Sequence, residues 1–155
     1  MTLRPATPDD RSFLERVYAE SRAAELEATG WPDDEKDAFC RGQFAAQDSH
    51  YRTYYPDCEY LVVERDGEPV GRLYRERRAD EIRIVDIALL ADARGHGLGG
   101  RLMRRILDEA AAADLMVRIH VERTNPARRL YDRLGFELVE EGDVYDLLAW
   151  SAAPR

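Results

Sequence analysis

The sequence predicts an α/β protein built on a mixed sheet with helices on both faces. Stretches with helical spacing alternate with β-rich stretches, and their order along the chain is βαα-βββ-α-β-α-ββ. A length of 155 residues suits a single domain with its own core, and the chain contains no linker, repeat or low-complexity tract.

The first part of the chain predicts one short strand and two helices. Residues 3–6 look like an edge strand, because proline is tolerated there. Thr7 or Asp9 can cap a helix that starts with Pro8, continues at helical spacing to residue 29 and ends at Gly30. A second helix is expected over residues 33–52.

From residue 59 onward the apolar spacing changes to that of strands. Asp66-Gly67 is a typical hairpin turn between the first two of these strands. Leu98, Leu102, Ile106 and Ala110 then share one face of an amphipathic helix. The expected strands cover 60–64, 70–76, 82–90, 115–122, 136–140 and 145–150, and the expected helices cover 98–113 and 125–134, the latter closed by Gly135.

The most informative segment is Arg94-Gly95-His96-Gly97-Leu98-Gly99, which joins a strand to a helix. Its glycines leave the backbone N–H groups unshielded, and a helix N-terminus adds partial positive charge. Such a loop forms a cradle for a phosphate or pyrophosphate, to which Arg94 can add a charge-assisted bond. His96 is expected at the surface near the phosphates rather than as a catalyst.

The same glycines admit two other interpretations. One is a plain turn before an ordinary helix. The other is the dinucleotide fingerprint G-x-G-x-x-G, which Gly95, Gly97 and Gly100 match, with Glu122 roughly where a ribose-binding acid is expected. That fingerprint usually stands in the first strand–turn–helix unit, whereas these glycines lie past the middle of the chain and about one such unit follows.

Two blocks resemble the GCN5-related N-acetyltransferase (GNAT) family. Arg94, Gly97 and Gly99 match its acyl-CoA loop, Gln/Arg-x-x-Gly-x-Gly/Ala. Further along, Asn125-Pro126-Ala127-Arg128-Arg129-Leu130-Tyr131 with Gly135-Phe136 resembles its second block. The resemblance covers roughly residues 59–150, and the first 58 residues match only in element type.

The resemblance implies the GNAT fold, with a mostly antiparallel sheet of about seven strands and about four helices. Within one acetyltransferase domain, residues 1–58 would supply acceptor-side helices and 59–150 the acyl-CoA-binding core. The strand 82–90 would splay from the strand 115–122 and leave room for the pantetheine arm of acetyl-CoA. The residues expected to bind the cofactor are Ala88, Leu89, Leu90, Arg94, Gly95, His96, Gly97, Leu98, Gly99, Asn125 and Arg128.

The resemblance also assigns roles within the second block. Tyr131 would place its O–H near the departing CoA sulfur, although a tyrosine on an amphipathic helix is otherwise usually core. Asn125 suits a helix N-cap and would also bind the cofactor arm. The usual proline after the strand is Ala91 here, and we expect little consequence because proline there only stiffens the turn. Arg128 belongs to a basic cluster expected near the 3′-phosphate, with Arg101, Arg104, Arg105 and Arg129.

The general base is open among three residues and water. Asp86 interrupts an apolar strand, where a carboxylate is costly unless it is paired or lines a cavity. Its simplest alternative role is an ion pair with Arg83 or Arg118. His120 and Glu122 share one face of the next strand, and each has a structural alternative as an ordinary sheet or helix-start residue.

Composition excludes several classes of protein. A net charge of −8 and a pI of about 5.0 do not suit a general nucleic-acid binder. Cys40 and Cys58 form no C-x-x-C pair, the three histidines share no ligand spacing, and we expect no metal. Residues 1–10 lack the features of a secretory signal, and no apolar run is long enough to span a membrane. We therefore expect a cytoplasmic protein.

These observations together favour an enzyme that moves an acetyl group from acetyl-CoA to a primary amine in a ternary complex. A non-catalytic acyl-CoA sensor or scaffold is the alternative, and a dinucleotide-binding protein is a remote one. The acceptor would be a small-molecule or peptide amine, and the sequence is compatible with a homodimer. Acidic side chains in the first two helices, with Trp31, Tyr51, Tyr54 and Tyr55, would favour a cationic amine.

Overall fold

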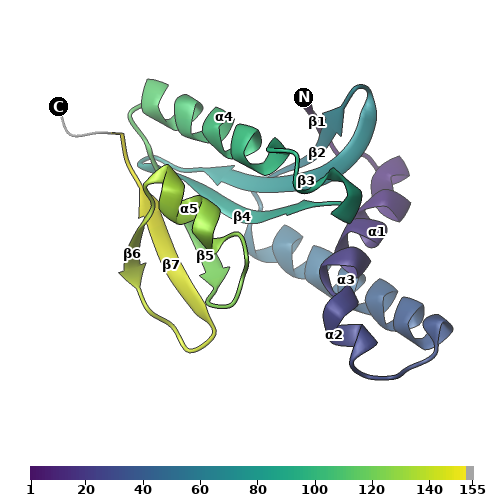
Figure 1. Cartoon of the computed structure of the whole chain (residues 1–155). Coiled ribbons are helices and arrows are strands. Elements are labelled where there is room, and N and C mark those ends of the chain that lie inside the picture. Colours follow the sequence, from purple (N-terminus) through teal and green to yellow (C-terminus); the bar gives the residue numbers. More distant parts are fainter. Residues whose placement is uncertain (153–155) are drawn as a thin grey trace. The chain divides into compact units, whose positions relative to one another are not determined.

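The computed structural model describes residues 1–152, and it contains seven strands, five α-helices and two short 3₁₀ helices (Figure 1). The strands are β1 (Thr2–Pro5), β2 (Glu59–Arg65), β3 (Glu68–Arg77), β4 (Glu81–Leu89), β5 (Met116–Glu122), β6 (Glu137–Glu140) and β7 (Tyr145–Trp150). The helices are η1 (Pro8–Asp10), α1 (Arg11–Ser21), α2 (Ala23–Glu27), α3 (Asp33–Tyr54), η2 (Ala91–Ala93), α4 (Leu98–Ala112) and α5 (Arg128–Leu134).

The strands pair in the order β1-β2-β3-β4-β5-β7-β6. The β4–β5 pair is parallel, whereas β1–β2, β5–β7 and β6–β7 are antiparallel. This confirms the predicted mixed sheet, and β1 with its proline is an edge strand as expected. The chain divides into two compact units: unit 1 is residues 1–74 with 86–94, and unit 2 is residues 75–85 with 95–155.

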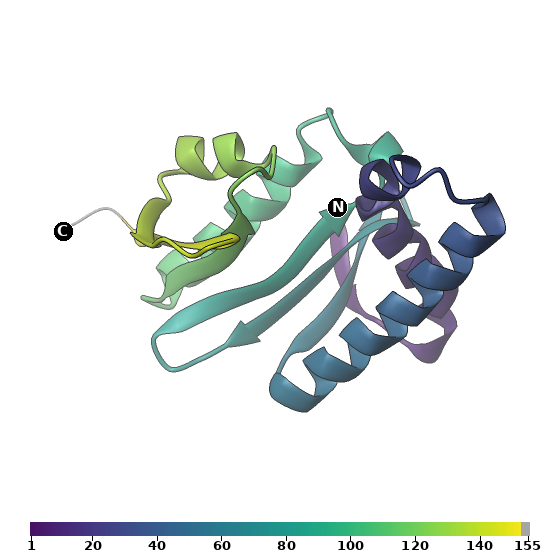
Figure 2. The ribbon, with the colours of Figure 1, turned by 90° about the horizontal axis from the view of Figure 1, so that it is seen from below.

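Unit 1 is organised around its helices. The core where α1, α2 and α3 meet contains Leu14, Tyr18, Leu26, Cys40 and Phe44, all at most 6% exposed. Figure 2 shows α3 in blue alongside the teal strands of this unit, and Tyr51 of α3 meets Tyr74 of β3 edge-on, with ring centroids 5.9 Å apart. The turn Asp66-Gly67 has φ of 55° and 80°, the left-handed conformation that the sequence predicts for a tight hairpin.

Unit 2 is built on β5, β6, β7, α4 and α5. The predicted apolar face of α4 is confirmed, because Leu98, Leu102, Ile106 and Ala110 are each no more than 1% exposed. Gly135 ends α5 with φ of 95°, as predicted, since only glycine adopts this C-cap conformation without strain.

Two helix boundaries differ from the expectation. The helix predicted up to residue 29 breaks at Arg22, where φ is −105° and ψ is 1°. There the Ser21 hydroxyl donates to the Tyr18 carbonyl at 2.6 Å, so a side chain competes with the backbone for the helical acceptor. The helix predicted from residue 125 begins only at Arg128, and Ala127 rather than Asn125 is its N-cap.

Candidate active site

The glycine loop has the backbone that a cradle requires. Gly95 and Gly97 have φ of 81° and 76°, and Gly97 is the N-cap of α4. A Cβ added at either position would meet nothing within 4 Å, so the backbone conformation rather than lack of space requires glycine. His96 is exposed, in agreement with the expected surface position.

The first turn of α4 is fixed by packing inside unit 2. Leu98 is 1% exposed and anchors the helix start in the core. A Cβ built on Gly100 would lie 3.8 Å from the Leu130 side chain, which places the start of α4 beside α5. Figure 1 shows these two green helices next to each other. Unit 2 thus brings together the glycines of the first block and the second block of the GNAT resemblance.

The end of β4 belongs to unit 1, where it lies close against β3. A Cβ on Gly71 would come within 2.5 Å of the Ala88 carbonyl oxygen, so glycine permits this approach. The Leu90 N–H donates to the Val70 carbonyl at 2.8 Å. Arg94 Nε donates to the Leu89 carbonyl at 3.0 Å, so its side chain folds back on the strand end.

Asp86 forms an ion pair, but not with the residues that the sequence suggested. Its Oδ2 contacts Nη2 of Arg72, which is 3% exposed. Arg83 and Arg118 instead reach Glu81, at 3.2 Å and 2.5 Å. The reason is the β4–β5 register, which pairs Glu81 with Met116 and Arg83 with Arg118 and so gathers the arginines around Glu81.

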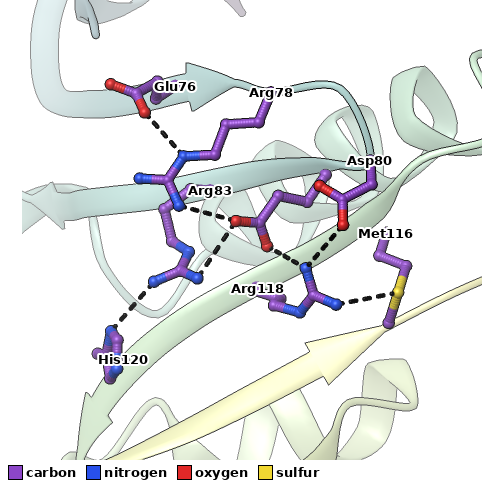
Figure 3. Close-up of polar contacts among 8 residues, drawn as sticks. Glu76, Arg78, Asp80, Arg83, Met116, Arg118 and His120 are labelled. Atoms are coloured by element: carbon purple, nitrogen blue, oxygen red, sulfur yellow. Dashed lines mark hydrogen bonds and ion pairs between the residues drawn. The ribbon is translucent and has the colours of Figure 1, made fainter. Parts of the chain in front are cut away.

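His120 lies at the end of this arginine–carboxylate network, which Figure 3 draws. Arg83 Nη1 lies 3.5 Å from Nδ1 of His120. Desolvation of the ring and the charge of Arg83 lower the pKa of His120, which favours the neutral imidazole. In the tautomer whose Nδ1 accepts from Arg83, the proton lies on Nε2 and no ring nitrogen is left to take another.

The network is held by the carboxylate of Glu81, which is 3% exposed. Burial alone would raise the pKa of Glu81, but the hydrogen bond from Arg118 and the charge of Arg83 outweigh it and lower that pKa. Arg78 adds a third bond at 2.9 Å. Glu81 therefore remains ionised and, through Arg118, joins the start of β4 to β5, the strand that carries His120.

The remaining predicted residues of unit 2 have structural partners. Glu122 accepts from the Tyr145 hydroxyl at 3.4 Å. Asn125 Oδ1 accepts from the Ala127 N–H at 2.9 Å, so this side chain shapes the turn before α5. Tyr131 is 4% exposed and packs against Phe136, with ring centroids 5.6 Å apart.

Arg128 is engaged by Asp146, a buried carboxylate that the sequence did not reveal. Arg128 Nη1 lies 3.0 Å from Oδ2 of Asp146, and Arg123 Nε donates to Oδ1 at 3.1 Å. The bond from Arg128 is the largest cause that lowers the pKa of Asp146. Of the predicted basic cluster, Arg101, Arg104, Arg105 and Arg129 are exposed.

The acceptor-side aromatic residues do not gather at one place. Trp31 precedes α3 and contacts Phe39 edge-on at 5.5 Å, whereas Tyr51, Tyr54 and Tyr55 lie at the other end of this helix. A helix of 22 residues is roughly 30 Å long, so one acceptor mouth cannot include both groups. Several of the nearby acids are already paired, for example Glu25 with Arg22 at 2.9 Å.

Two residues missed from the sequence stand out in unit 1. One is Arg72, the partner of Asp86, and the available signal was a charged residue in each of two successive apolar strands. The other is Glu20, whose Oε1 accepts from the Ala91 N–H at 2.7 Å. That contact joins segments 71 residues apart in the sequence and has no local signal.

Among residues 1–152, no group of three or more His, Cys, Asp or Glu side chains is arranged to hold a metal ion. Over the same residues, no helix is both long and apolar enough to cross a membrane.

The fold and these segments define an acetyltransferase of the GNAT class. Residues 14–136 match the acetyltransferase (GNAT) family, and the chain belongs to it. The expectation of an acyl-CoA-dependent N-acetyltransferase is thus confirmed at the level of the family.

One relative and two solved structures illustrate the range of similarity. The chain is 32% identical over 85 residues to the putative [ribosomal protein bS18]-alanine N-acetyltransferase of Bacillus subtilis (strain 168), an alignment that covers 53% of this chain and 56% of that protein. The PaiA N-acetyltransferase of Thermoplasma acidophilum, solved in complex with coenzyme A, is 15% identical with a TM-score of 0.72, over 97% of this chain and 98% of that one. An acetyltransferase from Thermus thermophilus is 22% identical with a TM-score of 0.69, over 98% of both chains. At such identities the two structures show a shared fold.

Proposed function

We propose that this chain transfers an acetyl group from acetyl-CoA to a primary amine by direct attack in a ternary complex. The observation that carries the proposal is the glycine loop. Two exposed glycines in left-handed conformations lead directly into the N-terminus of the 15-residue helix α4, in a chain of the GNAT family. Backbone N–H groups and the helix dipole at such a place favour a pyrophosphate.

In this proposal the cofactor is bound by backbone more than by side chains. Ala88, Leu89 and Leu90 pair with the pantetheine arm as an added strand would, and residues 94–99 hold the pyrophosphate. Asn125 and Arg128 are the remaining residues proposed to bind the cofactor. The bond of Arg94 to the Leu89 carbonyl supports this assignment, because it orders the segment between the two groups.

The chemical step requires little beyond holding the two reactants together. The amine nitrogen attacks the thioester carbonyl, the C–N bond forms, and the C–S bond breaks to release the thiolate of CoA. Tyr131 donates its proton or a hydrogen bond to that sulfur, and the Leu89 N–H stabilises the oxyanion. Neither cysteine lies in the two matched blocks, which favours direct attack over an acyl-enzyme.

Asp86 is our first choice to take the proton of the attacking amine, directly or through water. Its side chain is 22% exposed, so part of the carboxylate remains accessible despite the ion pair. Glu122 is engaged by Tyr145, and the Arg83 contact leaves His120 a poor base. If replacing Asp86 leaves the pH–rate profile unchanged, water is the base.

The acceptor is proposed as a small-molecule or peptide amine. The printed name of the Bacillus subtilis relative describes acetylation of a ribosomal protein at alanine, so a peptide with an N-terminal alanine belongs in the test. Exposed acids at the start of α3, such as Asp34 and Glu35, favour cationic amines and predict that this preference weakens as salt rises.

The test measures thiol release from acetyl-CoA with a panel of cationic, neutral and acidic amines and peptides, at low and high ionic strength. We expect amine-dependent release, and propionyl-CoA in a parallel series defines the acyl chain. Binding of acetyl-CoA by calorimetry without release for any amine would indicate a non-catalytic acyl-CoA module instead.

A further inference from the structure

A buried cation lies in unit 1, beside the segment proposed to hold the cofactor. Arg72 of β3 is 3% exposed, and its Nη2 donates to Oε1 of Gln47 at 2.9 Å. Its guanidinium carbon lies 4.8 Å from the centre of the Tyr74 ring. Within residues 1–152, Nε and Nη1 have no hydrogen-bond partner. A buried guanidinium is costly without a counter-ion, and Asp86 supplies it.

The other side of this pair is open to solvent. Asp86 Oδ2, which contacts Arg72, is buried, whereas the side chain as a whole is 22% exposed. The exposure therefore belongs to the other atoms of the side chain, which include Oδ1. One oxygen is held by the protein, and part of the side chain can still be reached from outside, which a purely structural ion pair does not require.

We propose that Arg72 is a positioning residue for acetyl transfer: it fixes the Asp86 carboxylate so that the outer oxygen meets the acceptor amine, while Gln47 and Tyr74 fix Arg72. The inference rests on the proposed function, because it presumes that an amine is acetylated beside Asp86. It gives buried Arg72 a role in holding Asp86, which the general-base assignment alone does not require.

Asp86 is the counter-ion of Arg72, because the tyrosines packed nearby stay neutral. Burial alone would lower the pKa of Arg72, but the charge of Asp86 raises it, so the guanidinium stays charged. Burial raises the pKa of Tyr74, and that of Tyr60 to about 12, so both phenols stay neutral. Lysine is not equivalent to this arginine, because its compact ammonium has no planar group to lie over the Tyr74 ring.

The experiment is a double-mutant cycle in the full chain, with the best amine from the panel as acceptor. Arg72→Gln and Asp86→Asn are made singly and together, and kcat and KM are measured for the acceptor and for acetyl-CoA. We expect each single variant to lower kcat/KM for the acceptor by about tenfold or more, with KM for acetyl-CoA within about twofold. The double variant should be no worse than Asp86→Asn, because Arg72 acts through Asp86.

Two further variants separate positioning from folding. Gln47→Ala removes one bond to Arg72 and leaves the ion pair; it should lower kcat/KM a few fold in the parent and not at all in the Asp86→Asn background. If Arg72→Gln fails to fold, the cycle of Gln47→Ala with Asp86→Asn replaces it. Arg75→Gln is the matched control on the same strand, since Arg75 pairs with Glu109 at 2.6 Å, and it should leave acceptor kinetics unchanged.

Each outcome bears on a different claim. Independent, multiplying effects of Arg72→Gln and Asp86→Asn would overturn the positioning role and leave the acetyltransferase function intact. If Asp86→Asn has the acceptor kinetics of the parent, Asp86 does not act on the amine, and the positioning role of Arg72 is overturned. A parent that releases no CoA with any amine would overturn the proposed function itself.

Discussion

The Glu20 carboxylate accepts a hydrogen bond from the Ala91 backbone N–H, with 2.7 Å between Oε1 and the nitrogen. Glu20 lies in the last turn of α1, and Ala91 directly follows the segment Ala88–Leu90. Proline has no N–H, so the family's usual residue at this position could not make the bond. Ala91 thus contributes a donor, beyond the loss of stiffness that the sequence suggested, and ties α1 to the end of β4.

We predict that breaking this bond weakens acetyl-CoA use. Glu20→Ala and Ala91→Pro should each raise KM for acetyl-CoA by about threefold, because an exposed charge-assisted bond contributes about 1 kcal/mol or less. Ala91→Pro suits the local backbone, since Leu90 has φ of −59° and ψ of 148°, a conformation allowed before proline. The two changes remove the same bond, so the double variant should match the stronger single one.

The control for this pair is Glu15→Ala on the same helix. Glu15 pairs with Arg11 of α1 at 3.9 Å, within the helix itself, so its loss should leave KM unchanged. Effects of Glu20→Ala and Ala91→Pro that multiply would show that the shared bond is not their cause.

A second prediction concerns the charge at the phosphate cradle. Gly97 has φ of 76°, so any substitution strains the loop, but Asp and Asn tolerate this region about equally. Gly97→Asp should weaken acetyl-CoA binding at least tenfold more than Gly97→Asn, because it adds a negative charge beside the phosphates. Calorimetry on both folded variants checks this, and equal affinities would remove the phosphate assignment.

The parts of the structure that the sequence predicted are those with a local cause. The glycine loop at the start of α4 and the apolar face that includes Leu102 and Ile106 follow from residue type and spacing. The break at Arg22 was missed, because a Ser21 hydroxyl bond rather than a glycine or proline interrupts the helix. Local propensity alone does not reveal such competition.

The candidate site divides in the same way. The glycine loop could be recognised because consecutive residues, 94–99, determine its conformation. The partner of Asp86 could not be recognised in this way. A charged residue in an apolar strand indicates that a partner exists, but not which neighbouring strand supplies it. The observed choice of Arg72 over Arg118 depends on strand order and register, which involve the whole sheet.

A third prediction tests the proposed acid. Tyr131→Phe keeps the ring that packs against Phe136 and removes one O–H. We expect kcat to fall roughly 10²-fold while the affinity for CoA and the midpoint of thermal unfolding change little. Parental kcat in a folded variant would assign Tyr131 to the core alone.

The last prediction concerns stability in acid and tests the start of the fold. Arg4 binds both oxygens of Asp10 at 2.8 Å, and the Thr7 N–H donates to the same carboxylate at 2.8 Å. The bonds from Arg4 are the largest cause that lowers the pKa of Asp10, to about 2. Because the folded pKa lies below the unfolded value of about 3.9, this group stabilises the fold fully above pH ~4 and loses its contribution as pH falls toward about 2.

Asp10→Asn should therefore cost about 1–2 kcal/mol of unfolding free energy at neutral pH, and the difference from the parent should shrink between pH ~4 and ~2. Denaturant unfolding across this range measures it, with the exposed neighbour Asp9→Asn as the control. A cost that is the same at pH 7 and pH 2 would mean that Asp10 acts through packing, since only an ionised carboxylate binds Arg4 in this way.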